Sequence, residues 1–137
     1  SDWEMVAQQT GDNSREEAEK VMKLFLEQEP DLRVVFAESD EMALGAVAAC
    51  QKAGYDCQDW PVIFGIDGLD DALEAIETGK MQGTVYNDKE DQAMELAKLS
   101  VEIVCGKDTN RKRLKEGRYY LSEYCRVDSS NVDHFLK

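Results

Sequence analysis

The chain has 137 residues, a length that suits one domain or part of one. Acidic residues outnumber basic residues by 29 to 16, which gives a formal net charge of −13. This charge disfavours a nucleic-acid partner and an anionic membrane surface, because both depend on clustered cations. The basic run at 111–115 is therefore interpreted as a solvated loop. No apolar run approaches the ~18 residues of a membrane span.

Segments typical of strands and of helices alternate along the chain. A capping box, Ser14 with Glu17, opens the first helix, and Gly54, Gly79 and Gly106 follow the ends of later helices. Such alternation predicts an α/β fold with a parallel sheet and right-handed crossovers. The expected order is a strand at 3–9, a helix from 14 to 30, a strand at 32–37, a helix at 42–53, a strand at 62–66, a helix at 70–79, a strand at 83–86, a helix at 89–105 and a strand at 119–127.

Small polar or acidic residues end three of the predicted strands. The segments read VVFAESD at 34–40, VIFGIDG at 62–68 and GTVYND at 83–88. In an open α/β sheet, ligands bind beyond the carboxyl ends of the strands. The pattern therefore predicts that Ser39, Asp67 and Asn87 lie where a small polar ligand is held.

The sequence offers little that is typical of an enzyme. His134 is the one histidine, and it lies near the C-terminus, away from any candidate nucleophile. Neither a G-x-G-x-x-G turn nor a G-x-x-x-x-G-K-[ST] loop is present, so a nucleotide would lack its phosphate cradle. The acidic pairs Asp40-Glu41 and Asp70-Asp71 are interpreted as favourable charges at helix starts. We expect binding without turnover, and neither a cofactor nor a catalytic residue.

Four cysteines leave three pairings open. Cys50 with Cys57 is the favoured pair, because it closes a short loop across a helix end, and Cys105 with Cys125 is then possible. Free buried thiols are the alternative. No Cys-x-x-Cys spacing occurs, so no metal site is expected.

Several of these segments resemble the type I periplasmic sugar-binding proteins, the solute receptors of sugar ABC importers. AESDEMALGA at 37–46 resembles the family's A-x-N-D-x-M-A-x-G-A, and FGIDG at 64–68 resembles its G-[FVI]-D segment. GTVYND at 83–88 is close to the G-T-V-x-N-D of the galactose/glucose-binding branch, and 124–135 looks like the C-terminus of that branch. The resemblance implies a parallel-sheet, three-layer sandwich that forms part of the type I fold.

The resemblance also implies roles for five residues. Asp67 and Asn87 match positions that hydrogen-bond sugar hydroxyls in the galactose/glucose branch. Ser39 stands where the family usually has Asn, and Asn13 falls where an aromatic ring often stacks on the sugar. Arg15 matches a position that is Arg in some relatives, and its alternative interpretation is a surface charge in the first helical turn.

The function implied is non-catalytic. A galactose-like or glucose-like monosaccharide would bind between two lobes and be delivered to an ABC permease. The location implied is periplasmic or extracellular, with lipid anchoring as one form of it. The nearest rivals are the effector-binding core of a LacI-type transcription regulator and the extracellular sensor module of a signalling receptor, because both share the fold.

Family members are about twice as long as this chain. By that comparison, 1–82 and 118–137 are predicted to belong to the C-terminal, sugar-binding lobe, and 83–117 to a strand–helix unit of the other lobe. The first strand of the C-terminal lobe, a central one, would be missing. Because a missing central strand leaves backbone groups unpaired, we expect the chain to pair with another copy, by dimerisation or strand swapping, or with the rest of a longer protein.

Overall fold

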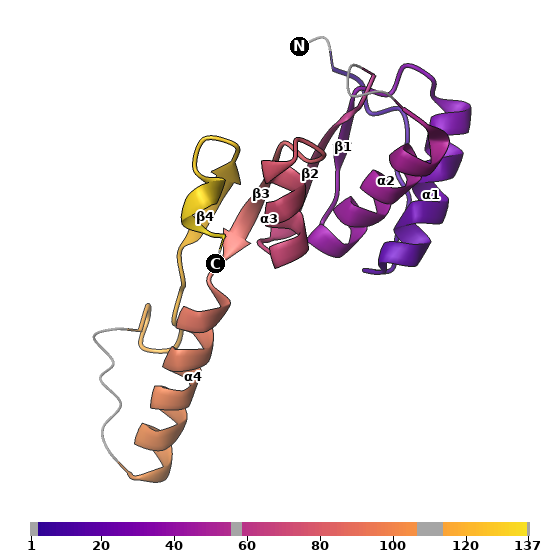
Figure 1. The fold of residues 1–137 in the computed structure, drawn as a ribbon. Helices are drawn as coiled ribbons and strands as arrows, with labels where there is room; N and C mark the ends of the chain where they lie inside the picture. The colour runs from indigo at the N-terminus through magenta and orange to yellow at the C-terminus, as the bar shows by residue number, and fades with distance from the viewer. Residues whose placement is uncertain (1–2, 56–58, 107–113, 137) are drawn as a thin grey trace. The chain divides into compact units, whose positions relative to one another are not determined.

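The structure is a computed structural model that describes residues 3–55, 59–106 and 114–136 (Figure 1). It divides into two compact units. The first unit comprises Ser1–Tyr86 with Arg126–Lys137, and the second comprises Asn87–Cys125. Within the described residues, no helix is both long enough and apolar enough to cross a membrane.

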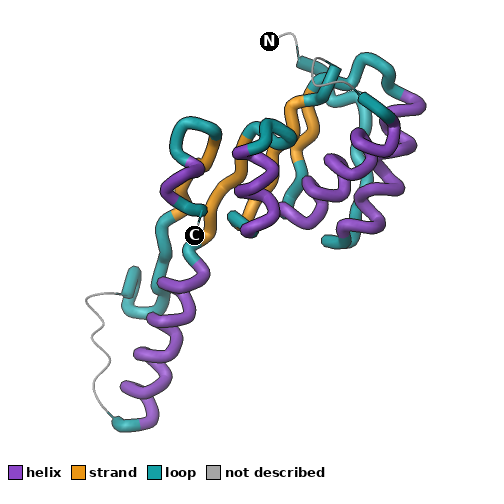
Figure 2. Tube along the Cα trace, in the orientation of Figure 1, coloured by secondary structure: helices purple, strands orange, loops and turns teal. Residues whose placement is uncertain are grey.

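The alternation of helices and strands predicted from the sequence is present (Figure 2). The sheet has the order β1-β2-β3-β4, and β2 pairs in parallel with both β1 and β3. The register sets Val34 opposite Val62 and Phe64 opposite Gly83. The elements are α1 (Arg15–Gln28), β1 (Val34–Phe36), α2 (Asp40–Ala53), β2 (Val62–Asp67), α3 (Asp70–Glu77), β3 (Gly83–Asn87), α4 (Lys89–Val104), β4 (Tyr124–Asp128) and the 3-10 helix η2 (Val132–His134).

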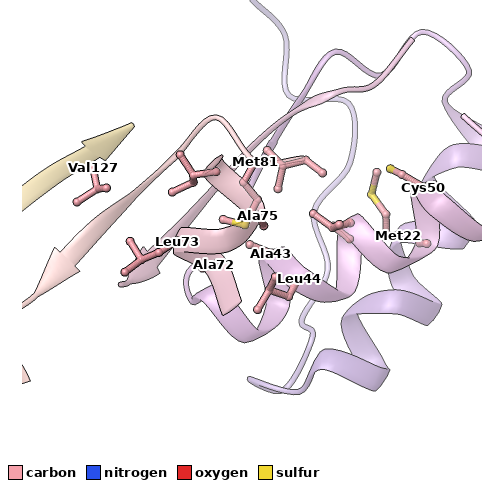
Figure 3. Close-up of a cluster of buried hydrophobic side chains, with 14 of the residues drawn as sticks. Met22, Ala43, Leu44, Cys50, Ala72, Leu73, Ala75, Met81 and Val127 are labelled. Carbon is pink, nitrogen blue, oxygen red and sulfur yellow. The ribbon is translucent and has the colours of Figure 1, made fainter. Parts of the chain in front are cut away.

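The hydrophobic core of the first unit lies between α2, α3 and the sheet (Figure 3). α1 packs on α2, and Met22 carries the contact into the core. β2 sends Ile63 inward, and Val127 and Val132 close the core from the C-terminal segment. α2 is buried over much of its surface, as its mostly apolar sequence predicts.

Two predicted strands are wrong in whole or in part. No strand forms at 3–9, where Trp3 and Met5 are about three-quarters exposed, at 76% and 77%. An alternating segment becomes a strand only when a neighbour accepts its backbone hydrogen bonds, and the described residues provide none here. The last strand begins at Tyr124 rather than at 119, because Tyr119 instead bridges back to Lys115 in a turn.

The helix ends match the sequence predictions more closely than these two strands do. The hydroxyl of Ser14 accepts a hydrogen bond from the backbone N–H of Glu17, and Gly54 ends α2 at φ 73°. α3 begins at Asp70, as the sequence predicts. Leu69 is the N-cap residue, and it makes no side-chain cap hydrogen bond.

α4 presents an apolar face that nothing in the described part of the second unit covers. Met94 is 52% exposed, Val101 60% and Val104 86%. The helical spacing of these residues correctly predicts a helix. Spacing alone does not supply the surface against which an amphipathic helix packs.

Candidate functional site

The carboxylate of Asp40 accepts three hydrogen bonds from other parts of the first unit. It lies in the first turn of α2 and is fully buried. Its Oδ2 accepts hydrogen bonds from the backbone N–H of Gly68 at 2.7 Å and of Leu69 at 2.8 Å. Its Oδ1 accepts from the hydroxyl of Thr84 at 2.7 Å. One side chain therefore joins α2, the loop after β2, and β3.

Burial raises the pKa of Asp40 above the usual range of a carboxyl group. The three hydrogen bonds oppose this shift, because they favour the ionised form, and the nearby charge of Asp67 adds to it. A glycine makes the close approach possible. A Cβ on Gly65 would lie 2.2 Å from Asp40 Oδ1, so any other residue there would displace the carboxylate.

Asp67 ends β2 in a strained backbone conformation. Its φ is 122°, a value that residues with a side chain rarely adopt. The next residue, Gly68, has φ 79°, and a Cβ there would lie 2.2 Å from the Tyr86 ring. Because Asp40 binds the two N–H groups that follow Asp67, it holds this strained turn in place.

The Asp67 side chain is half-buried. No hydrogen bond or ion pair from the residues that the structure describes engages its carboxylate. Strained backbone conformations persist where the surroundings over-determine them, and they cluster at binding sites. Asp67 is therefore the predicted residue whose geometry best suits a ligand contact.

Asn87 ends β3 and belongs to the second unit. Its Oδ1 accepts a hydrogen bond from Nε2 of Gln92 at 2.5 Å. The same nitrogen of Gln92 donates to the hydroxyl of Ser122 at 2.8 Å. The side chain of Asn87 is thus oriented by a residue of the first turns of α4.

The other three predicted site residues have structural contacts. Ser39 is only 5% exposed and caps α2, accepting from the N–H of Met42 at 3.4 Å. Arg15 donates to Glu41 at 2.9 and 3.2 Å and to Asp71 at 3.0 Å, and these contacts raise its pKa. Through these contacts Arg15 joins the start of α1 to the first turns of α2 and α3. Asn13 is exposed, in a turn with φ 50°.

Within the described ranges, no hydrogen bond or ion pair joins any of the five predicted residues to another. The structure brings Arg15 to Glu41 and Asp71, and Asp67 to a turn held by Asp40. Asp40 and Gln92 are not among the site residues predicted from the sequence. Asp40 was interpreted as a charge at a helix start, although its place in the A-x-N-D motif was a signal of a more specific role. Gln92 had no signal.

The cysteines are free where the structure describes them. Cys50 is buried, and burial raises its pKa to about 11. Cys105 and Cys125 are exposed, whereas Cys57 lies outside the described residues. Neither pairing considered from the sequence is formed, because Cys50, Cys105 and Cys125 are all free thiols. Over 3–55, 59–106 and 114–136, no group of three or more His, Cys, Asp or Glu could hold a metal ion.

Comparison with known proteins identifies the class. The model of the periplasmic binding protein domain matches residues 1–108. The D-galactose/methyl-galactoside binding periplasmic protein of Haemophilus influenzae is 36% identical over 110 residues, covering 78% of this chain and 32% of that protein. The ribose import binding protein of Bacillus subtilis is 38% identical over 87 residues, covering 64% of this chain and 27% of that protein.

Solved structures agree with the sequence comparisons. An ABC transporter solute binding protein from Bacillus halodurans with bound myo-inositol has a TM-score of 0.84 and 31% identity, covering 96% of this chain and 42% of that one. A periplasmic solute binding protein from Actinobacillus succinogenes with bound D-allose has a TM-score of 0.84 and 25% identity, covering 96% of this chain and 43% of that one.

The chain belongs to the periplasmic binding protein family, in its type I sugar-binding group. The predicted fold class, an α/β fold that forms part of the type I architecture, is confirmed. The chain spans less than half the length of each relative described above.

The role of Asp40 leads to a stability prediction. Asp40→Ala leaves two backbone N–H groups and one hydroxyl without their acceptor, and we expect a loss of about 2–5 kcal/mol in the free energy of unfolding. Asp40→Asn keeps an acceptor for the N–H pair and can donate to Thr84, so it should cost about 1 kcal/mol or less. Denaturant unfolding of both variants measures this difference.

Asp31→Ala and Asp31→Asn are matched controls, because Asp31 is exposed in the loop before β1. Both should change stability by less than about 0.5 kcal/mol. Equal losses for the Ala and Asn variants of Asp40 would contradict the role assigned to its hydrogen bonds.

Proposed function

We propose that this chain forms part of a receptor that binds one monosaccharide between two lobes and delivers it, chemically unchanged, to an ABC importer. The observation that carries the proposal is Asp67, a carboxylate held at the end of a central strand on a strained backbone, with no hydrogen-bond or ion-pair partner among the described residues. A carboxylate in that state is suited to accept hydrogen bonds from vicinal hydroxyls.

The proposed contacts follow the residue types. Asp67 accepts from sugar hydroxyls, and Asn87 provides an amide. Ser39 accepts one bond as a helix cap, and its hydroxyl donates to none of the described residues, so we propose that it donates to the ligand. Asn13 provides a polar contact in place of a stacking ring. Arg15 shapes the edge of the binding site through its ion pairs with Glu41 and Asp71.

We propose a galactose-like or glucose-like ligand and an ABC permease as partner. The proposed location is periplasmic or extracellular, and attachment to the cell surface by a lipid anchor is one form of it. The galactoside-binding relative, which is 36% identical over 110 residues, supports that ligand class. The relatives are named as binding or import-binding proteins, which favours a transport receptor over a transcription regulator or a sensor module. The assignment of 83–117 to a second lobe is part of this proposal.

A thermal-shift screen of the full-length protein against hexoses, pentoses and inositols tests the function. A ligand that binds only the folded state stabilises it by mass action, by about 2.7 kcal/mol at a hundredfold excess over Kd. We expect a large shift with one hexose and a small shift with its epimers. If no sugar in the screen shifts the unfolding midpoint, the proposal is overturned.

Substitution of Asp67 separates its binding role from its backbone strain. Both Asp67→Ala and Asp67→Gly should abolish sugar binding, because each removes the carboxylate from a desolvated site. Only the Gly variant relieves the positive φ, so we expect it to be more stable than the Ala variant by about 1 kcal/mol. Calorimetric titration and unfolding midpoints measure the two effects.

The same pair at Asp31, where φ is not in the left-handed region, is the control. There Gly should be the less stable variant, and binding should be unchanged. Undiminished affinity in Asp67→Ala would remove Asp67 from the site.

We also propose that the 137-residue chain on its own self-associates through β1. In the described sheet β1 is an edge strand, and Phe36 on it is 79% exposed and stacks on Phe64 at 5.4 Å. The unpaired backbone N–H and C=O groups of an edge strand form a template for pairing with another chain, and the exposed Phe36 ring adds apolar surface to it. We expect a dimer by sedimentation at micromolar concentration. A cooperatively folded monomer would show the edge to be stable as it is.

A further inference from the structure

The start of α4 carries a hydrogen-bond network around Asn87. Asp88 caps the helix, accepting from the N–H of Asp91 at 2.9 Å, which fixes the first turn. Gln92 follows on that turn and reaches back to Oδ1 of Asn87. Both protons of its amide nitrogen are used, one on Asn87 and one on Ser122.

A second contact holds the segment that contains Ser122. The hydroxyl of Tyr120 donates to Oδ2 of Asp91 at 2.7 Å. This contact favours the protonated hydroxyl and raises the pKa of Tyr120 to about 12. Two separate hydrogen bonds therefore fasten 120–122 to the first turns of α4, and Ser122 is held where it accepts from Gln92.

The direction of the amide of Asn87 follows from this network. A side-chain amide has one accepting end and one donating end, and a turn of 180° exchanges them. Because Gln92 presents N–H groups, it holds the Oδ1 end of Asn87 toward itself. The Nδ2 end, with its two protons, has no hydrogen bond to the residues that the structure describes.

We infer that Gln92 is a positioning residue that fixes Asn87 as a hydrogen-bond donor to the ligand. The inference rests on the proposed function, in which Asn87 contacts a sugar hydroxyl, and adds a direction to that contact. The ligand atom opposite Asn87 then acts as an acceptor. The partner chemistry at this position is a hydroxyl oxygen with a free lone pair, or a group that can only accept.

Gln92→Glu tests the direction with the smallest change of shape. A carboxylate cannot donate, so Asn87 should turn its Nδ2 toward Glu, while the hydroxyl of Ser122 rotates and donates. The end of Asn87 presented to the ligand becomes an acceptor. Gln51→Glu makes the same chemical change at an exposed position of α2 and is the matched control.

The binding measurement uses D-glucose, D-galactose and their singly deoxyfluorinated derivatives on the full-length protein, by calorimetric titration. Fluorine accepts weakly and cannot donate. We expect at least one fluorinated sugar to bind the unmodified protein within about tenfold of its parent, and Gln92→Glu to weaken that derivative by roughly threefold to tenfold more than it weakens the parent. Gln51→Glu should leave both affinities unchanged. Equal losses for parent and derivative would mean that Gln92 acts only on stability, and would overturn the inference.

A second measurement needs no ligand. In the 15N-labelled full-length protein, the side-chain amide protons of Gln92 should exchange slowly with water and show contacts to Ser122, whereas those of Asn87 should exchange rapidly. The reverse pattern would overturn the inference even if sugars bind. If the expected pattern is found but no sugar binds, the proposed function fails, and the recognition role of Gln92 fails with it.

Discussion

The buried carboxylate of Asp40 is the interaction on which the rest of the first unit's site geometry depends. It takes a charge out of water, which costs several kcal/mol, and the compensation comes from three donors, two in the loop after β2 and one on β3. Such a group adds little net stability, because the hydrogen bonds largely offset the loss of hydration. Its effect is geometric. α2, the loop after β2, and β3 can meet only in the arrangement that satisfies all three bonds.

The strain at Asp67 becomes intelligible once Asp40 is fixed. A non-glycine residue at φ 122° costs about 1–3 kcal/mol, and an unconstrained loop would relax. Here the two N–H groups after Asp67 are bound to Asp40, and Gly65 and Gly68 leave room for the carboxylate and for the Tyr86 ring. In the segment G-I-D-G, Gly65, Asp67 and Gly68 therefore each meet one geometric requirement of this turn. The strain is tolerated because the surrounding contacts are stronger than the tendency of one residue to relax.

Local signals predicted most of the fold, whereas the long-range contacts could not be predicted from the sequence. Three short-range features are confirmed by the structure: the Ser14 cap, the glycine after α2, and the alternation of strand-like and helix-like segments. The segment at 3–9 failed as a strand because its pattern says nothing about a neighbouring strand. The carboxyl-end rule singles out Ser39, Asp67 and Asn87, whereas for Asp40 the sequence predicts only a favourable charge in the first turn of a helix, which is where Asp40 lies. Its burial arises from Thr84 and Gly68, which are far away in sequence.

The two proposed contact residues share a principle of construction. Asp67 is set by Asp40 through the backbone, and Asn87 is set by Gln92 through its side chain. A carboxylate only accepts, and an amide held by its oxygen presents its donating end. A sugar hydroxyl both donates and accepts, so either character suits any hydroxyl in isolation. Discrimination between epimers must then come from the direction in which each group points. Directions are fixed by Asp40 and Gln92, which the ligand need not touch. If the proposed contacts hold, changes at Asp40 or Gln92 should therefore alter ligand selectivity without changing a contact side chain.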